Sequence, residues 1–383
     1  MRLYYGDSYL REFAAEVVSV ANGRAYLDRS AFYPESGGQP SDGGVIAGAR
    51  VVDVIDEGDR VAHVIEGSLE VGPATASIDW PRRFDHMQQH TGQHMLSAVL
   101  DSEFGIPTVS FHLGRDACTI DLDTAAIGPS ILADAELRAN RWVCENRPVT
   151  VSYHDSREDL GLRKLSNREG TIRVVTIDGL DRSACGGTHV RATGEVGPIL
   201  VRRVEKIRGI VRIEFLCGLR AVARARADYD LLSDAARQLS ASIDQLPELV
   251  GAQAARVTES AKTLRKLGIE LAQLRGAELA RSTQPSERGW KVHVRRIPSG
   301  AIEDDTRAEA QAFVAGGRAV YVAAAEESGA VLVAVSPDGP FKAGETMKAL
   351  FARHGGRGGG NPQLAQGSVK GLSGLLAELS SLW

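Results

Sequence analysis

Residues 81–104 read PRRFDHMQQHTGQHMLSAVLDSEF, and this stretch decides how the centre of the chain folds. Its apolar positions recur at steps of three and four residues, and Pro81 suits the first turn of a helix. The pattern therefore predicts a helix over 81–104. His90 and His94 are one turn apart on it, roughly 40° around the axis. Both imidazoles should leave the same face and offer two nitrogens to one cation.

A second pair of metal-ligand types, Cys185 and His189, lies in the segment ACGGTHV over 184–190. The glycines between them allow a tight turn that aims both side chains at one point. Together the two pairs make a three-histidine, one-cysteine set for one Zn²⁺ per chain. Either pair by itself is more often a solvated or packing coincidence. Two pairs in one chain favour the metal site.

The remaining chain divides into regions of different pattern, and its 383 residues exceed what one core normally organises. Runs rich in β-branched residues over 51–55 and 61–65 predict a hairpin. Leucines 264, 267, 271 and 274 have coiled-coil spacing, and 243–247 interrupts the helical pattern. The predicted fold class is α+β, with a β-barrel-like domain over 1–80, a zinc-binding α+β domain over 81–220, a helical hairpin or coiled coil over 221–283 and a C-terminal α/β domain over 288–383.

Composition excludes several classes of protein. A hydrophobic content of 43% with 25% charged residues is typical of globular chains rather than disordered or collagen-like ones. No segment approaches the ~18 apolar residues of a membrane helix, and the N-terminus lacks a signal sequence, so we expect a cytoplasmic protein. Disulfides are then not expected, and we expect Cys118, Cys144 and Cys217 to be buried.

Charge is segregated along the chain. The net charge is −4, yet residues 1–80 carry −7, and residues 201–226 hold eight basic side chains against two acidic ones. Such a run is usually a solvated face, but it also suits the phosphates of RNA. A glycine-rich loop predicted over 354–362 could approach RNA closely. The candidate RNA contacts are Arg202, Arg203, Lys206, Arg208, Arg353 and Arg357.

Three segments together resemble the editing domain of alanyl-tRNA synthetase and the free-standing alanyl-tRNA editing proteins of the long AlaX type. They are MQQHTGQHMLS over 87–97, ACGGTHV over 184–190 and FYPESGGQPSDG over 32–43. The tail GGGNPQLAQG over 358–367 is similar to the C-terminal domain of that synthetase. The resemblance covers essentially the whole chain.

This resemblance implies a trans-editing hydrolase that maintains translation fidelity by deacylating alanine tRNA mischarged with serine or glycine. The synthetase's ATP-using domain has no counterpart in this sequence, so we expect no aminoacylation activity. Arginines beside the glycine-rich loop suggest that the C-terminal domain binds tRNA, whereas the leucine spacing of the preceding helix suggests dimerisation. The resemblance implies that the substrate pocket contains Gly37, Gly38, Gln39 and Asp42, with the side chains of Gln39 and Asp42 reading the serine hydroxyl. His112 is a further candidate for the pocket, although its strand context by default predicts a satisfied, partly buried histidine.

The same residues also fit functions other than zinc-dependent deacylation. Four protein ligands fill a zinc tetrahedron, as in a structural site, so a non-catalytic tRNA-binding module fits the same residues. Catalysis would need a displaced ligand, such as Cys185, or a five-coordinate metal. The tail by itself suggests a phosphoesterase, but residues 1–220 lack the Asp-His-His signature. A threonyl-tRNA editing role shares the zinc pattern and fits the first 80 residues less well.

Overall fold

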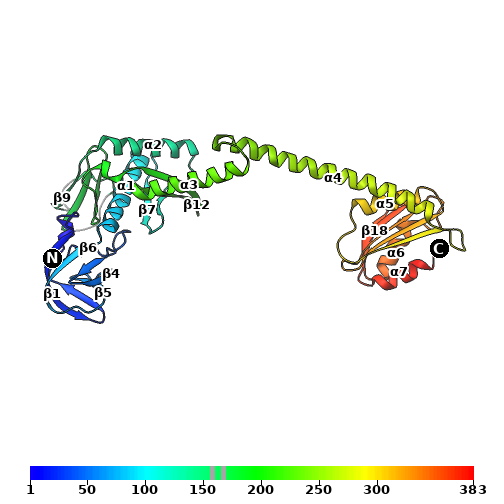
Figure 1. The fold of residues 1–383 in the computed structure, drawn as a ribbon, viewed down its shortest axis with the longest axis horizontal. Coiled ribbons are helices and arrows are strands. Elements are labelled where there is room, and N and C mark those ends of the chain that lie inside the picture. The colour runs from blue at the N-terminus through cyan, green and yellow to red at the C-terminus, as the bar shows by residue number, and fades with distance from the viewer. Residues whose placement is uncertain (156–159, 165–169) are drawn as a thin grey trace. The chain divides into compact units, whose positions relative to one another are not determined.

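The structure is a computed structural model that describes residues 1–155, 160–164 and 170–383 (Figure 1). This chain forms two compact units, Met1–Asp234 and Ala235–Trp383. Helices and sheets are mixed in both units, and the predicted α+β class is confirmed.

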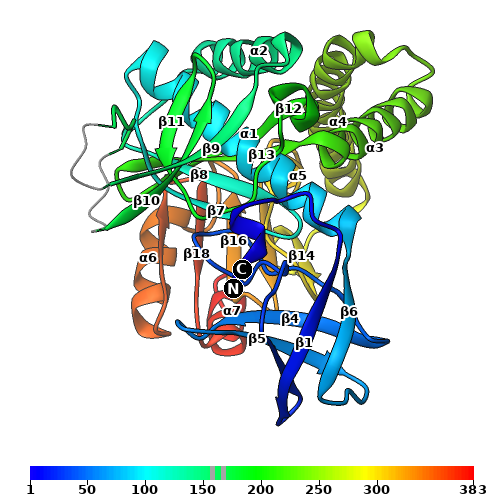
Figure 2. The ribbon, with the colours of Figure 1, turned by 90° about the vertical axis from the view of Figure 1, so that its left-hand side faces the viewer.

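The first unit begins with a closed six-stranded barrel in the order β1-β2-β5-β4-β3-β6 (Figure 2). Along β1, Phe13, Ala15 and Val17 are buried between exposed neighbours, because strand side chains alternate between two faces. The predicted hairpin is β4–β5, and the predicted barrel-like domain is confirmed. The strands are β1 (Glu12–Ala21), β2 (Arg24–Leu27), β3 (Gly44–Ile46), β4 (Ala49–Asp56), β5 (Val61–Glu66) and β6 (Gly72–Ile78).

Helix α1 (Trp80–Phe104) follows the barrel and confirms the predicted central helix. Asp79 caps it by accepting a hydrogen bond from Arg82 N at 3.3 Å, and it ends at Gly105 in the left-handed conformation. Every residue from His90 to Leu100 is buried. Because buried polar groups need partners inside the protein, the polar side chains of α1 are placed by what they bind.

Two antiparallel sheets and α2 (Pro129–Glu145) pack against α1 around one apolar core. Cys118 and Cys217 are buried there, as expected. The same expectation is wrong for Cys144, which is exposed because α2 buries the opposite face with Ala135 and Ala139. One sheet has the order β12-β13-β8-β7 and the other β11-β10-β9. Their strands are β7 (Thr108–Leu113), β8 (Cys118–Leu122), β9 (Val149–Asp155), β10 (Thr171–Ile177), β11 (Asp181–Ala184), β12 (Ile199–Ile207) and β13 (Ile210–Cys217).

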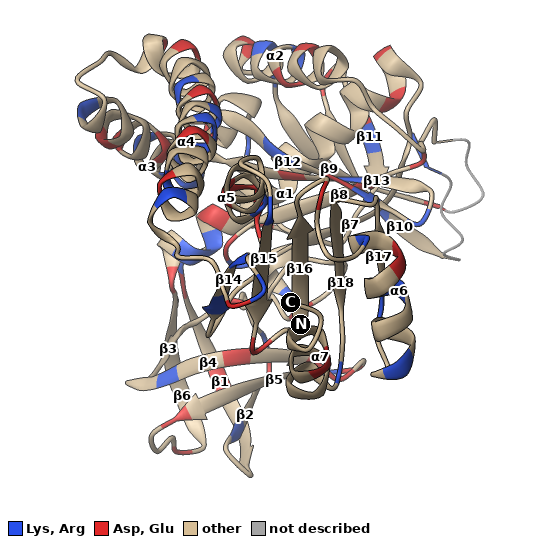
Figure 3. Cartoon of the chain, turned by 90° about the vertical axis from the view of Figure 1, so that its right-hand side faces the viewer, with Lys and Arg blue, Asp and Glu red and all other residues tan. Residues whose placement is uncertain are grey.

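Two helices follow, α3 (Gly218–Gln238) and α4 (Leu246–Ser282), with a 3₁₀ turn over Ile243–Gln245 between them. The predicted interruption is confirmed, and Pro247 lies in the first turn of α4. That these helices fold back as a hairpin stays a prediction. Helix α4 carries both signs of charge along its length (Figure 3), and its four evenly spaced leucines are exposed in the described chain.

The C-terminal sheet has the order β14-β15-β16-β18-β17, with β14 and β15 parallel and the other pairs antiparallel. Val320 and Val322 of β15 face one core, and Tyr321 and Ala323 face another. The elements are β14 (Lys291–Ile297), α5 (Asp304–Val314), β15 (Ala319–Ala325), β16 (Ala330–Val335), α6 (Ala343–Arg353), β17 (Arg357–Gly360), β18 (Leu364–Ser368) and α7 (Leu372–Ser380).

The loop predicted over 354–362 is partly wrong, because its centre is the edge strand β17. A Cβ atom at Gly358 would lie 2.5 Å from Phe351 Cε2, and one at Gly360 would lie 2.0 Å from Leu364 O. Glycine therefore lets this strand approach its neighbours more closely than any other residue could. Within residues 1–155, 160–164 and 170–383, no helix is both long and apolar enough to cross a membrane.

Candidate metal centre

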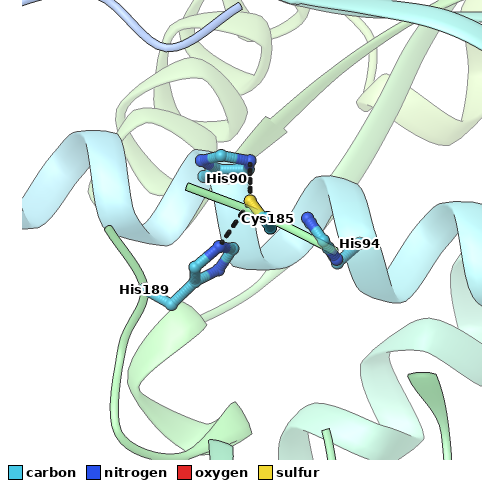
Figure 4. A group of neighbouring side chains, drawn as sticks. All are labelled: His90, His94, Cys185 and His189. Atoms are coloured by element: carbon cyan, nitrogen blue, oxygen red, sulfur yellow. Dashed lines mark hydrogen bonds between the residues drawn. The ribbon is translucent and has the colours of Figure 1, made fainter. Parts of the chain in front are cut away.

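The first unit brings the four predicted ligands together. Helix α1 supplies His90 and His94, and the turn after β11 supplies Cys185 and His189. Their ligand atoms all lie within 4.8 Å of one another. Cys185 Sγ is 3.5 Å from His90 Nε2 and 3.3 Å from His189 Nε2. Figure 4 shows the three imidazoles grouped around the sulfur.

The turn between Cys185 and His189 is shaped by its second glycine. A Cβ atom at Gly187 would lie 2.2 Å from His90 Cε1, far inside contact distance. Arg173 Nη1 donates to the carbonyl oxygens of Cys185 at 2.7 Å and Gly187 at 3.0 Å. The turn is therefore held from outside while its inner side lies directly against the His90 ring.

Each histidine is oriented through its other ring nitrogen. Nδ1 of His90 lies 2.8 Å from Gln39 Oε1, and Nδ1 of His94 lies 2.8 Å from Asp181 Oδ2. In the third contact, His189 Nδ1 lies 3.1 Å from Thr91 Oγ1. These bonds leave Nε2 of each ring as the free ligand atom. Such outer partners are the usual companions of metal-binding histidines.

Two of these outer partners, Thr91 and Asp181, were not singled out from the sequence. Asp181 lies four residues before Cys185, and Thr91 directly follows His90. Asp181 Oδ1 also accepts from Arg163 Nε at 2.7 Å, which fixes the carboxylate from a second side. In the sequence, the only sign of this role is that Asp181 lies close to the Cys185–His189 motif. Only the folded structure shows that its carboxylate contacts the ring of His94.

The electrostatics of the cluster favour a thiolate. Burial opposes ionisation of Cys185, but His90 and His189 lower the pKa of its thiol well below the ordinary value. Burial, together with the charge of His90, lowers the pKa of His189 to about 3. Burial also opposes a proton on His94, but Asp181 and Cys185 raise the pKa of His94 to about 9. The site thus offers one thiolate and buried imidazole nitrogens, and a bound cation would displace the remaining proton.

The residues present fit a metal ion. Three imidazoles and one thiolate are the ligand types that Zn²⁺ takes in proteins, and four is its usual coordination number. His90, His94 and His189 are buried, whereas Cys185 is partly exposed. In the described part of the chain, these four form the cluster whose donor atoms could hold a metal ion.

A cavity of about 490 Å³ opens on this cluster. His90, His94 and Cys185 belong to its wall, so a small group inside would contact the candidate metal ligands directly. Residues of α1, β7, β11 with the turn after it, and the loop before β3 contribute to the lining. They include Gly37, Gln93, Thr108, Ser110, Phe111 and Ser183.

Of the five predicted substrate contacts, Gly37 lies in the cavity wall. Gly38 packs against Phe111, and its carbonyl oxygen accepts from Leu113 N at 3.1 Å. His112 is exposed and lies outside the wall. Asp42 is fully buried elsewhere, where its carboxylate accepts from Arg83 Nε at 3.0 Å.

Gln39 is also fully buried and outside the cavity wall. Its Oε1 lies 2.8 Å from His90 Nδ1 and accepts from Thr188 N at 3.0 Å, and its Nε2 donates to Thr188 Oγ1 at 2.8 Å. Gln39 therefore orients a ligand histidine from behind. Direct substrate contact by Gly38, Gln39, Asp42 and His112 stays a prediction.

The basic run over residues 201–226 is partly neutralised by folding. Arg202 pairs with Glu214 at 3.1 Å and Arg203 with Glu205 at 3.0 Å, both near the β12–β13 edge. Lys206 and Arg208, the other two candidate RNA contacts on this run, are exposed and form no ion pair with a carboxylate of the described residues.

Several of the more distant basic residues are paired as well. Farther along the same run, Arg212 pairs with Asp121 and Arg220 with Asp85. In the second unit Arg353 pairs with Glu378, and Arg357 is exposed at the start of β17.

Comparisons with known proteins match both units. The family described as threonyl and alanyl tRNA synthetase second additional domain matches residues 172–214, and the DHHA1 domain matches residues 292–382. The alanyl-tRNA editing protein AlaX-L of Pyrococcus horikoshii is 32% identical over 96% of this chain and 94% of its own length.

Two further relatives differ in how much of them the chain covers. The alanyl-tRNA editing protein Aarsd1 of Danio rerio is 34% identical over 59% of this chain and 60% of its own length. An alanine–tRNA ligase of Pyrococcus abyssi is 33% identical over 97% of this chain, which spans 42% of the ligase.

Proposed function

The chain belongs to the family of alanyl-tRNA editing proteins, and from that premise we propose that it deacylates mischarged alanine tRNA in trans. The bond broken is the ester between a wrong amino acid, serine or glycine, and the tRNA. The observation that carries the proposal is the His₃Cys cluster opening on a cavity.

A second enzyme is needed for a physical reason. A pocket shaped for alanine cannot exclude glycine by size, and it rejects a small added hydroxyl poorly. Binding alone therefore leaves serine and glycine errors on alanine tRNA. A separate hydrolytic site with different selectivity removes them, which maintains translation fidelity.

We assign one Zn²⁺ per chain to His90, His94, Cys185 and His189 because the cluster offers the donor types and the number that zinc requires. When bound, zinc would polarise the ester carbonyl or a water molecule toward attack. Cys185 is the only partly exposed ligand of the four, and it belongs to the cavity wall. Cys185 would therefore be the ligand of a bound zinc ion that substrate or water in the cavity could reach.

The protein surface then has to hold the tRNA. Lys206 and Arg208 are the exposed cations of β12 and its turn that lack an ion pair in the described chain. We propose that they contact phosphate directly, with Arg202 and Arg203 contributing where the nucleic acid competes for their carboxylates. Arg353 and Arg357 are proposed tRNA contacts of the second unit.

The exposed leucines of α4 suit a different partner, a second copy of this chain in a homodimer.

The test compares alanine tRNA charged with serine, glycine or alanine. Wild-type protein should release serine or glycine and spare alanine. Chelation of zinc, or His94→Ala, should lower the rate by about two to three orders of magnitude. Full activity in a metal-free His94→Ala protein would refute zinc-assisted hydrolysis.

A second candidate function is a non-catalytic tRNA-binding module, which the complete set of four ligands favours because it matches a structural zinc. That protein would bind the mischarged tRNA and retain zinc but release none of the three amino acids. The same assay therefore separates the two candidates.

A further inference from the structure

Gln93 leaves a buried hydrogen-bond acceptor unused. The side chain is 2% exposed and lies on α1 between His90 and His94. Its Nε2 donates to Ser97 Oγ at 2.8 Å, but its Oε1 has no hydrogen-bond partner among residues 1–155, 160–164 and 170–383. A buried oxygen without a partner costs about 1–3 kcal/mol, so such atoms in folded proteins need an explanation.

The position of Gln93 points to a ligand. The residue belongs to the wall of the cavity that opens on the metal cluster. Ser97 Oγ accepts from Gln93 Nε2 and also from Thr108 Oγ1, at 2.7 Å. Because this network engages the amide nitrogen, the carbonyl oxygen is the atom left for a guest in the cavity.

Two other side-chain oxygens of the wall, those of Ser110 and Ser183, are already committed to hydrogen bonds. Ser110 Oγ donates to Asp121 Oδ2 at 2.7 Å, and Ser183 Oγ donates to Asp181. The carbonyl oxygen of Gln39, which the sequence pointed to, accepts from Thr188 N and is in hydrogen-bond contact with His90 Nδ1. Gln93 Oε1 therefore differs from these groups in having no partner within the described chain.

We propose that Gln93 Oε1 accepts a hydrogen bond from the side-chain hydroxyl of a seryl ester, which makes Gln93 a specificity-determining residue; this inference rests on the proposed function. A neutral amide oxygen suits a neutral hydroxyl group. The ester's ammonium group fits less well, because a divalent cation held by His90 and His94 would repel it. Glycine has no hydroxyl, so its ester does not use this contact.

The experiment measures kcat/KM for seryl- and glycyl-tRNA(Ala) with wild-type protein and Gln93→Met. We expect the seryl value to fall about tenfold, the loss of one neutral hydrogen bond, while the glycyl value stays unchanged. Gln88→Met is the matched control. Gln88 is also buried on α1, but it donates to Glu195 O outside the cavity wall. The ratio of the seryl to the glycyl kcat/KM of Gln88→Met should match that of the wild-type protein.

Zinc content and thermal unfolding are measured for every variant. If Gln93→Met binds less zinc, the same ratio is measured for Ser97→Ala, which removes the anchor of the Gln93 amide, and the ratio should again fall. An equal loss on both esters, or an unchanged ratio in both variants, overturns the inference while leaving the deacylase intact. A wild-type protein inactive on both esters overturns the proposed function, and this inference with it.

Discussion

Gly187→Ala tests whether the turn that carries Cys185 requires glycine, which has no Cβ atom, at position 187. A Cβ atom at position 187 would lie 2.2 Å from His90 Cε1, 2.4 Å from His90 Nδ1 and 3.0 Å from Gln39 Oε1. Carbon atoms in contact sit about 3.5–4.0 Å apart, so the ring or the turn has to move by more than about 1 Å.

A displacement of that size exceeds what a metal site tolerates, since ligand distances hold to within about 0.2 Å. The same methyl group presses on the Gln39 contact that orients His90. Loss of an outer contact alone lowers metal affinity about 10–100-fold. Gly187→Ala should therefore weaken zinc binding at least about 100-fold, or about 2.8 kcal/mol.

The assay is competition for zinc with a chromophoric chelator, followed by deacylation of seryl-tRNA(Ala). Gly186→Ala is the matched control, because among the described residues a Cβ atom there would contact only Tyr5, at 3.9 Å. The control should keep wild-type affinity and activity. Wild-type zinc affinity in Gly187→Ala would refute the reasoning, and equal losses in both variants would show a general backbone effect instead.

Other buried contacts give three more predictions. Asp181→Asn removes the carboxylate that orients His94 and should lower zinc affinity about 10–100-fold in the chelator assay; unchanged affinity would exclude an orienting role. Burial lowers the pKa of His63 to about 4, below its unfolded value of about 6.5, so the unfolded state binds the extra proton first as pH falls. The free energy of unfolding should therefore drop by about 2 kcal/mol between pH 7 and pH 5, and His63→Asn should remove that part of the dependence in urea titrations; an unaltered pH slope would contradict it. Asp42→Ala leaves the guanidinium of Arg83 buried without a counter-charge and should cost about 3–5 kcal/mol in urea unfolding, whereas a loss typical of a surface pair, below about 1 kcal/mol, would show that the pair is not needed.

The four donors of the metal centre were open to prediction because each pair is local. Helical periodicity places His90 beside His94, and two glycines bring Cys185 toward His189. The residues that orient these ligands could not be predicted in the same way, because Gln39 lies 51 residues from His90 and Asp181 lies 87 residues from His94. The sequence predicts Gln39 as a site residue but does not show whether its side chain faces the substrate or the ring of a metal-binding histidine.

The charge count has the same limit. Eight basic side chains over 201–226 predict a strongly cationic surface, but a count within one segment misses carboxylates from other segments. Asp121 of β8 and Asp85 of α1 neutralise Arg212 and Arg220. Among the described residues of this segment, few exposed cations remain without an ion pair; Lys206 and Arg208 are two of them.

By itself the sequence determined one hairpin of the barrel, the central helix, the metal-ligand types and the family resemblance, because periodicity and motif spacing are local properties. The tertiary structure alone decided which polar groups are already paired. The side-chain oxygen of Gln39 has two hydrogen-bond partners, whereas the buried side-chain oxygen of Gln93 has none among the described residues. Whether a buried polar group is satisfied depends on partners from remote segments, and only the packed chain brings those partners together.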